Sequence, residues 1–547
     1  MRKVLVLTEA TYLNTGYAAD GREILAGLQK TGKYDIAEFS IYGTPDDPRR
    51  ASIPWKNYAN APLDNDVDEI KNAYHSNPIN QFGSWRFERV CLDFKPEYCI
   101  DIRDFWMCSF AKQSPYRELF NWIYKSTIDA VPQNSEWINT FASADKFLTI
   151  SEWANDVIKE QSDQTNLLGT ATICAPRSFK PVPKTPHRIS MGLNPDWKII
   201  GTVMRNQRRK LFPELFEAFG LYLKSSGDTQ TYLYCHTSYP DNGWDIPQLL
   251  VKEEISSRVL FSYTCPCGHL TIAPFADSLQ QCRNCKNFSA KPANVTAGAS
   301  VDQLEKIYQC FDLYIQCANS EGLGIGVVEA AACGVPVMAV DYSAMSETSR
   351  KCGGFPIPVQ SYNLELETGC YRAKPDVKAI VDYWKHFFRL SEPEREELSS
   401  HTFASYKANY NWDRVVKVWE DAIDATEPKN WNIPPRLIQP PPEVPKGLTN
   451  KQFIDWAVQA YLPYSGLKDS FEIMCILRDL NFGAFKNNPC GYFYSENSYF
   501  DRVNFSAFGR DHILNLFKQK AEAFNFWEKA RVGQIQFKKE SWLANDM

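Results

Sequence analysis

The sequence lacks any apolar stretch long enough to cross a membrane. A helical span needs about 18 or more apolar residues in a row, and the nearest approach, GIGVVEAAACGVPVMAV, is interrupted by Glu329 and Pro336. The amino terminus, MRKVLVLTEATYLNTG, has only the short apolar run VLVL, which is too brief for the apolar region of a secretory signal. We therefore expect a cytoplasmic protein with no membrane span.

The sequence also lacks a strong excess of one charge. Lys and Arg total 60 against 65 Asp and Glu, a net charge of −5, which argues against non-specific polyanion binding over the whole surface. Hydrophobic residues make up 44% and charged residues 23%, values that exclude the disordered and fibrous classes. The length of 547 residues predicts about three to four folding units.

Two α/β units are expected in the first three quarters of the chain. The first begins with the apolar run KVLVLT, a loop and the helix-like stretch DGREILAGLQKTG, and the pattern restarts near residue 198 with WKIIGTVMRN. Short buried strands that alternate with helices predict parallel sheets. We assign residues 1–190 to the first domain and 191–426 to the second, with a final helix over 410–425.

The composition changes after these units. Residues 427–446, EPKNWNIPPRLIQPPPEVPK, are rich in proline and predict an extended linker. Residues 447–547 show helical periodicity and predict a small, mostly helical domain. Its aromatic residues are spaced more like a hydrophobic core than like a base-stacking surface; they include Phe482, Tyr492, Phe500 and Trp527.

One group of cysteines has the spacing of a zinc ribbon. Residues 263–288 form the expected insertion, which contains Cys265, Cys267, Cys282 and Cys285. The first pair is C-x-C instead of the usual C-x2-C, so His269 is an alternative to Cys267 as the fourth ligand. A closed site with four ligands has no open position, and we therefore expect a zinc ion that supports folding and not catalysis.

The stretch SEGLGIGVVEA predicts an anion site between a strand and a helix. Gly322 and Gly324 have no Cβ atom, so backbone amides at the helix start can approach a phosphate, and the helix dipole favours negative charge there. Glu321 precedes the helix and Glu329 lies on it; carboxylates of this kind accept hydrogen bonds from the paired hydroxyls of a ribose or a sugar. The alternative is a solvated carboxylate on a surface helix.

Other candidate residues follow predicted strands. Arg205 and Lys210 lie in GTVMRNQRRK, where two cations can neutralise a diphosphate, although a solvated basic turn is the alternative. His236 in CHTSYPD is a second candidate, or else a buried and hydrogen-bonded histidine. Asp104 in YCIDIRDFWM is another polar candidate, or else a residue that caps a loop.

These motifs together resemble the GT-B glycosyltransferases, in particular the retaining, family-4-type enzymes, over roughly residues 1–425. The resemblance implies two Rossmann-like domains facing across a cleft, with an acceptor on the first and an NDP-sugar on the second. It implies that Arg205 and Lys210 bind the donor phosphates, with Glu329 on the ribose and Glu321 on the donor sugar. The NTG loop at Gly16 matches the family's glycine loop, and Gly322, Leu323 and Gly324 form the donor loop.

The resemblance implies no catalytic metal, because the cations and helix amides stabilise the departing diphosphate. Where many relatives have a histidine in the first domain, this chain has Asp104, which the resemblance makes the candidate contact for the acceptor.

The acceptor follows from a narrower resemblance. The run GTVMRNQRRKLFPELFEAF and the cysteine insertion resemble a group of glycosyltransferases common in viruses of bacteria. That group implies sugar transfer to a hydroxymethylated pyrimidine of viral DNA in the host cytoplasm. The alternatives are transfer to a surface-glycan precursor or a small metabolite, and a noncatalytic protein that only binds a sugar nucleotide. No oligomeric state is predicted.

Overall fold

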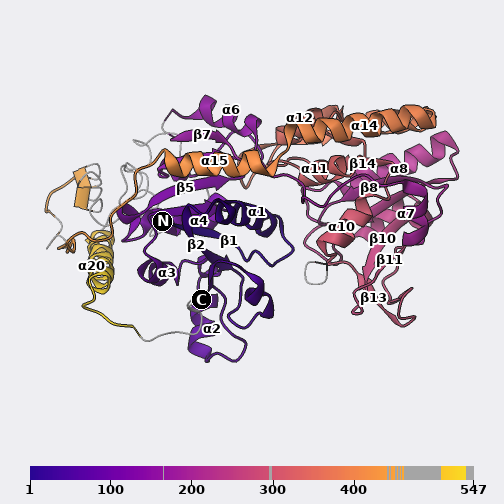
Figure 1. The fold of residues 1–547 in the computed structure, drawn as a ribbon. Helices are drawn as coiled ribbons and strands as arrows, with labels where there is room; N and C mark the ends of the chain where they lie inside the picture. Colours follow the sequence, from indigo (N-terminus) through magenta and orange to yellow (C-terminus); the bar gives the residue numbers. More distant parts are fainter. Residues whose placement is uncertain are drawn as a thin grey trace.

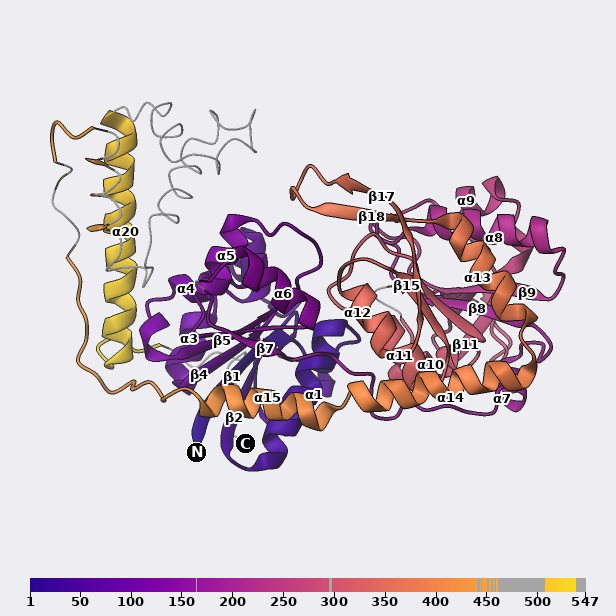
Figure 2. The same cartoon turned by 90° about the horizontal axis from the view of Figure 1, so that it is seen from above.

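A computed structural model describes residues 1–163, 165–294, 298–439 and 507–537, together with 443, 445–449, 452–453, 456 and 459–460. Two α/β domains lie side by side, and the last two helices of the second domain run along both (Figures 1 and 2). Most of the predicted helical domain lies outside the described residues, and so do Phe482, Tyr492 and Phe500.

The first domain is built on a seven-stranded parallel sheet with the strand order β3-β2-β1-β4-β5-β6-β7. The apolar run VLVL is buried in β1, as expected for a strand covered on both faces. Its strands are β1 (Arg2–Glu9), β2 (Tyr34–Ile41), β3 (Lys56–Ala59), β4 (Tyr98–Ile102), β5 (Asn121–Ser126), β6 (Lys146–Thr149) and β7 (Leu167–Thr170). Its helices are α1 (Gly16–Thr31), α2 (Asp68–His75), α3 (Phe87–Phe94), α4 (Phe105–Gln113), α5 (Ser135–Ala142) and α6 (Glu152–Gln161).

The second domain has a nine-stranded sheet whose central strands, β10-β9-β8-β14-β15-β16, are parallel. Strands β11 and β13 pair antiparallel with β10, and they carry the cysteine insertion. The strands are β8 (Lys198–Val203), β9 (Thr231–His236), β10 (Val259–Thr264), β11 (Leu270–Pro274), β12 (Gln280–Gln281), β13 (Phe288–Pro292), β14 (Leu313–Gln316), β15 (Val337–Val340) and β16 (Phe355–Ile357), with a separate hairpin of β17 (Val359–Leu364) and β18 (Tyr371–Pro375). The prediction of two α/β units with parallel sheets is confirmed.

The helices of the second domain end in a pair that crosses back to the first. They are α7 (Lys184–Met191), α8 (Phe212–Ser226), α9 (Ile246–Lys252), α10 (Val301–Tyr308), α11 (Ile325–Ala332), α12 (Ser343–Lys351), α13 (Val377–Arg389), α14 (Glu392–Asn409) and α15 (Trp412–Asp424). Helix α15 lies against α1, where a Cβ atom on Gly27 would be 2.2 Å from a methyl group of Val416. A glycine at position 27 therefore permits the close approach of the two helices.

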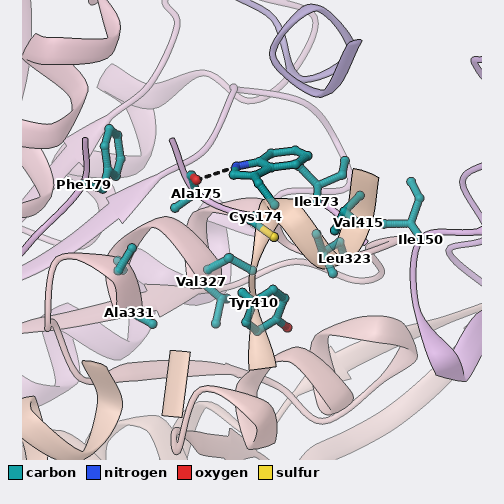
Figure 3. Packing of buried hydrophobic residues seen from close by; sticks show 14 of the residues in the cluster. Ile150, Ile173, Cys174, Ala175, Phe179, Leu323, Val327, Ala331, Tyr410 and Val415 are labelled. Carbon is teal, nitrogen blue, oxygen red and sulfur yellow. Dashed lines mark hydrogen bonds between the residues drawn. The ribbon is translucent and has the colours of Figure 1, made fainter. Parts of the chain in front are cut away.

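One hydrophobic core continues from the first domain into the second (Figure 3). Ile150 and Ile173 of the first domain share it with Leu323 and Val327, which lie at the start of α11, and with Val415 of α15. The indole N–H of Trp412 donates to the carbonyl of Ala175 at 2.9 Å. Because burial of apolar area favours this arrangement, the core fixes α11 and the loop before it relative to the first sheet.

The described part of the proline-rich segment is extended, but it is not a free spacer. It runs along helix α20 (Ala507–Arg531), whose buried Arg531 donates to the carbonyls of Trp431, Ile433 and Pro434 and pairs with buried Glu528 at 2.8 Å. The Tyr116 hydroxyl of the first domain donates to the carbonyl of Trp527 in α20. The carboxyl-terminal helix is thus attached to the first domain through the linker backbone.

Within the described ranges, every helix falls short of the length or apolar character that a bilayer crossing requires.

Replacing Arg531 with Ala should release this attachment. The substitution removes the closer ion-pair partner of the buried Glu528 carboxylate and leaves Arg436, 3.7 Å away, which costs up to about 3 kcal/mol. We expect faster hydrogen exchange of the backbone amides of residues 431–438, measured by mass spectrometry. The control is Lys529→Ala, an exposed position on the same helix, and equal exchange in both variants would contradict the assignment.

Candidate functional site

The centre of the candidate site is an ion pair between Lys210 and Glu321. Lys210 lies in the loop after β8, and its ammonium contacts Oε1 of Glu321, in the loop between β14 and α11. Arg209 binds the other carboxylate oxygen, with 2.7 Å between Nη1 and Oε2, and the Gln316 amide donates to Oε1 at 3.1 Å. The two loops are also joined by a backbone bridge between Lys210 and Ala318. Glu321 is therefore held by two cations and an amide.

The buried environment of Lys210 disfavours its charge. Burial lowers the pKa of the Lys210 ammonium well below its usual range, the nearby charge of Arg209 lowers it further, and Asp129 opposes both effects. Coulombic interactions are stronger in such surroundings than in water. An additional negative group placed here would stabilise both cations.

Arg205 pairs with a carboxylate outside the Lys210–Glu321 cluster. Its guanidinium forms a two-point pair with Asp241, with Nε to Oδ2 at 2.7 Å and Nη2 to Oδ1 at 3.0 Å, and its side chain is 47% exposed. The cation that joins Lys210 on Glu321 is Arg209, which sequence reasoning missed. The basic run RNQRRK signals this cluster, but residue spacing alone does not show which arginine points inward.

The glycines before α11 allow close packing at its amino terminus. Gly324 caps the helix at φ +77°, a left-handed conformation that favours glycine. A Cβ atom on Gly322 would lie 2.2 Å from the methyl group of Thr127, so this glycine marks a close approach of the two domains. The side chain of Leu323 is buried in the shared core. The loop thus brings the start of α11 directly against the first domain.

Glu329 lies further along α11 in a more apolar environment. The Tyr308 hydroxyl donates to its Oε2 at 2.7 Å. Burial raises the pKa of the Glu329 carboxyl to about 7, and the Tyr308 hydrogen bond opposes this shift. The two glutamates therefore differ, since Glu321 is paired with cations and Glu329 is not far from protonation at neutral pH.

On the first domain, Asp104 is the N-cap of α4 but does not use its side chain to cap the helix. It accepts a hydrogen bond of 2.6 Å from the Tyr17 hydroxyl, which also lies 3.1 Å from the Thr127 hydroxyl. Burial raises the pKa of Asp104 above its usual value. Tyr17 is next to Gly16, the first residue of α1, where an added Cβ atom would meet nothing within 4 Å. The loop-capping alternative does not describe this carboxylate.

His236 is half-buried at the end of β9. Its Nδ1 lies 2.9 Å from the Ser262 hydroxyl, and burial lowers the pKa of the imidazole to about 4. The ring is therefore uncharged at neutral pH.

Charged residues also connect the two domains beside the site. Arg372 of β18 reaches Asp129 of the first domain at 3.1 Å and Glu365 at 2.7 Å, and it donates to the Ser320 hydroxyl next to Glu321. Arg372 and Asp129 are 243 residues apart in the sequence. No local sequence pattern indicates their pairing, and sequence analysis did not find it.

The four predicted cysteines come together in the insertion. The sulfur atoms of Cys265, Cys267, Cys282 and Cys285 all lie within 4.8 Å of one another. Two of the separations are 3.7 Å, from Cys265 to Cys285, and 3.6 Å, from Cys267 to Cys282. His269 is outside this group, and its carbonyl accepts the Cys265 amide.

Part of the site lies in a segment that is similar to known proteins. Residues 290–363, which contain both Glu321 and Glu329, match the family model "Glycosyl transferases group 1". Over 122 residues the chain is 28% identical to the UDP-N-acetylglucosamine--peptide N-acetylglucosaminyltransferase GtfA subunits of Streptococcus parasanguinis and Streptococcus gordonii. This alignment covers 22% of the chain and 22% of each relative, so the chain spans about a fifth of the length of these relatives.

Solved structures share the fold. Sucrose-phosphate synthase from Thermosynechococcus elongatus superposes with a TM-score of 0.56 at 15% identity, over 78% of this chain and 100% of that one. WaaG, a glycosyltransferase involved in lipopolysaccharide biosynthesis, gives 0.51 at 12% identity over the same shares. At this identity the likeness shows the fold alone, which is the GT-B fold of two facing α/β domains.

The raised pKa of Glu329 predicts a particular dependence of stability on pH. The folded state retains a proton that the unfolded state has released, so the free energy of unfolding should fall as the pH rises from about 4.5 to about 7. In Glu329→Gln this contribution, about 1–3 kcal/mol, is absent. Urea unfolding at pH 5 and pH 8 measures it, and an equal pH-dependent loss in the variant and the natural chain would contradict the assignment.

Proposed function

We propose that this chain transfers a sugar from an NDP-sugar donor to an acceptor hydroxyl, with retention of configuration. The observation that carries the proposal is that Lys210 and Arg209 both form ion pairs with Glu321. Glu321 lies shortly before α11, in the segment that matches the glycosyltransferase family model. Cations and helix amides at one point suit a diphosphate.

In this proposal the donor diphosphate binds between Lys210 and the backbone amides of the loop at Gly322, Leu323 and Gly324. When the bond to the sugar breaks, negative charge develops on the departing diphosphate, and the buried ammonium stabilises it more than it stabilises the intact donor. Arg205 is exposed enough to exchange Asp241 for phosphate oxygens. His236, uncharged at the end of β9, completes the donor side.

The two glutamates have separate proposed roles. Glu321 accepts hydrogen bonds from the donor sugar, and Glu329 accepts them from the nucleotide ribose. Asp104 contacts the acceptor hydroxyl from the first domain. This role is supported by its side chain, which does not cap α4 and accepts a hydrogen bond from Tyr17.

The proposed acceptor is a hydroxymethylated pyrimidine of viral DNA in the host cytoplasm, and its support is the sequence resemblance described above. A surface-glycan precursor and a small metabolite are the competing acceptors. A peptide is tested as well, because the GtfA relatives are named as peptide N-acetylglucosaminyltransferase subunits. A noncatalytic protein would bind the donor without turning it over.

The test begins with thermal stabilisation by UDP-, GDP-, dTDP- and ADP-sugars, because a ligand bound to the folded state raises its stability. The stabilising donor is then supplied with DNA containing 5-hydroxymethylcytosine, unmodified DNA and a serine-rich peptide. Transfer to the modified DNA alone supports the proposed acceptor. Stabilisation with neither transfer nor hydrolysis would favour the noncatalytic alternative.

Lys210→Ala should reduce turnover of that donor by about a factor of 10²–10³, because one charge-stabilising group is lost. The matched control is Arg208→Ala, an exposed residue of the same basic run, which should retain activity. Full turnover in the Lys210 variant would contradict the proposal that the donor diphosphate binds at Lys210.

We also propose that the four cysteines hold a structural zinc ion. Tetrahedral ligands at about 2.3 Å from zinc lie about 3.8 Å apart, close to the 3.7 Å and 3.6 Å sulfur separations found here. Thiolate ligands on a surface insertion suit a site that supports folding.

Metal analysis of the purified protein should therefore find about one zinc per chain, and Cys282→Ser should lose most of it. His269→Ala should keep the zinc, because the ring lies outside the sulfur cluster. A folded natural chain without zinc would contradict this assignment.

A further inference from the structure

Two large aromatic side chains are exposed at one edge of the first sheet. Tyr42 follows β2 and is 38% exposed, and Trp106 lies in the first turn of α4, shortly after β4, and is 49% exposed. Strands β2 and β4 flank β1, and all three are parallel, so their carboxyl ends meet at the same edge. Phe82 lies between the two side chains, with ring centroids 6.0 Å from Tyr42 and 4.9 Å from Trp106. The three rings form one aromatic surface.

Hydrogen-bond acceptors adjoin this surface. Glu9 ends β1, and Asp104 lies two residues before Trp106. The small apolar cluster under the rings contains Phe82 and Met107, and Tyr17 packs against it while donating to Asp104. Aromatic and carboxylate groups thus share one edge.

The same edge faces the donor domain. Asp104, which accepts the Tyr17 hydroxyl, is close enough to Arg209 for its negative charge to raise the pKa of that guanidinium against the effect of burial. Thr127, beside Tyr17, approaches Gly322 in the loop before α11. A molecule on the aromatic surface would therefore lie on the side of the first sheet that meets the Lys210–Glu321 pair.

The backbone at Tyr42 supports a specific use of this residue. Its φ is +61°, in the left-handed region that a residue with a bulky side chain rarely adopts. Such a conformation is strained, and here it occurs in the residue whose ring meets Phe82.

From this juxtaposition we infer that Tyr42 and Trp106 bind the acceptor, and that the acceptor is an uncharged ring carrying hydroxyl groups. The inference rests on the proposed function and names the substrate class of the same site. Flat rings and the apolar faces of sugars pack on aromatic side chains, and the hydroxyl groups donate to Glu9 or Asp104. The two carboxylates disfavour an anionic ring, and Arg209 opposite disfavours a cationic one. Tyr17 is a positioning residue that orients Asp104.

Ligand-observed NMR by saturation transfer tests the inference without any turnover. The probes are glucose and 5-hydroxymethyl-2′-deoxycytidine, each paired with its phosphorylated form, together with UDP as a donor-side probe. We expect a saturation-transfer signal from at least one neutral probe. The signal from the phosphorylated form of that probe should be at least threefold weaker. The probe that responds distinguishes a sugar from a nucleoside as the source of the ring.

Trp106→Ala should reduce the signal of the neutral probe at least threefold, and Trp106→Phe should restore part of it. Phe288→Ala, which removes an exposed aromatic residue of the cysteine insertion, should change nothing, and UDP should respond equally in all variants. An unchanged neutral-probe signal in Trp106→Ala, or equal binding of the phosphorylated probes, would overturn the inference. If the natural chain bound none of UDP, GDP, dTDP and ADP, that result would instead overturn the proposed function and leave the aromatic surface intact.

Discussion

The ion pair between Lys210 and Glu321 is the constraint on which the site depends. It connects the loops that follow β8 and β14, and both groups are largely withdrawn from water. Removing one partner of a buried pair costs about 3–5 kcal/mol because the other charge is left uncompensated. The pair therefore fixes the loop before α11, and it concentrates positive charge where a diphosphate can replace or join the carboxylate.

The position of this pair relative to the first domain depends on packing. A shared hydrophobic core lies under α11, α15 lies along α1, and the Trp412 indole is bonded to the carbonyl of Ala175 (Figures 2 and 3). Arg372 and Asp129 add a charged link near Ser320. The loop that carries Lys210 and Arg209 and the carboxylate of Asp104 are consequently held in place by packed elements of both domains.

Sequence patterns predicted the parts of this architecture that repeat locally. Apolar runs such as VLVL predicted buried parallel strands, and the paired cysteines predicted the sulfur cluster. Each of these signals lies within one short segment of the chain. The partner of a long side chain is set by tertiary structure instead. Arg205 reaches Asp241, while Arg209 takes the place beside Lys210, and nothing in the run RNQRRK distinguishes the two. The aromatic surface at Tyr42 and Trp106 also arises only when strands distant in the sequence become neighbours.

A crystal structure of the protein with bound UDP would test most directly whether the diphosphate binds at Lys210. The account predicts that the diphosphate lies about 3 Å from the Lys210 ammonium and from a backbone amide at the start of α11, with the ribose at Glu329 and the Glu321 carboxylate turned from its present partners. A nucleotide bound elsewhere, with the Lys210–Glu321 pair intact, would contradict it.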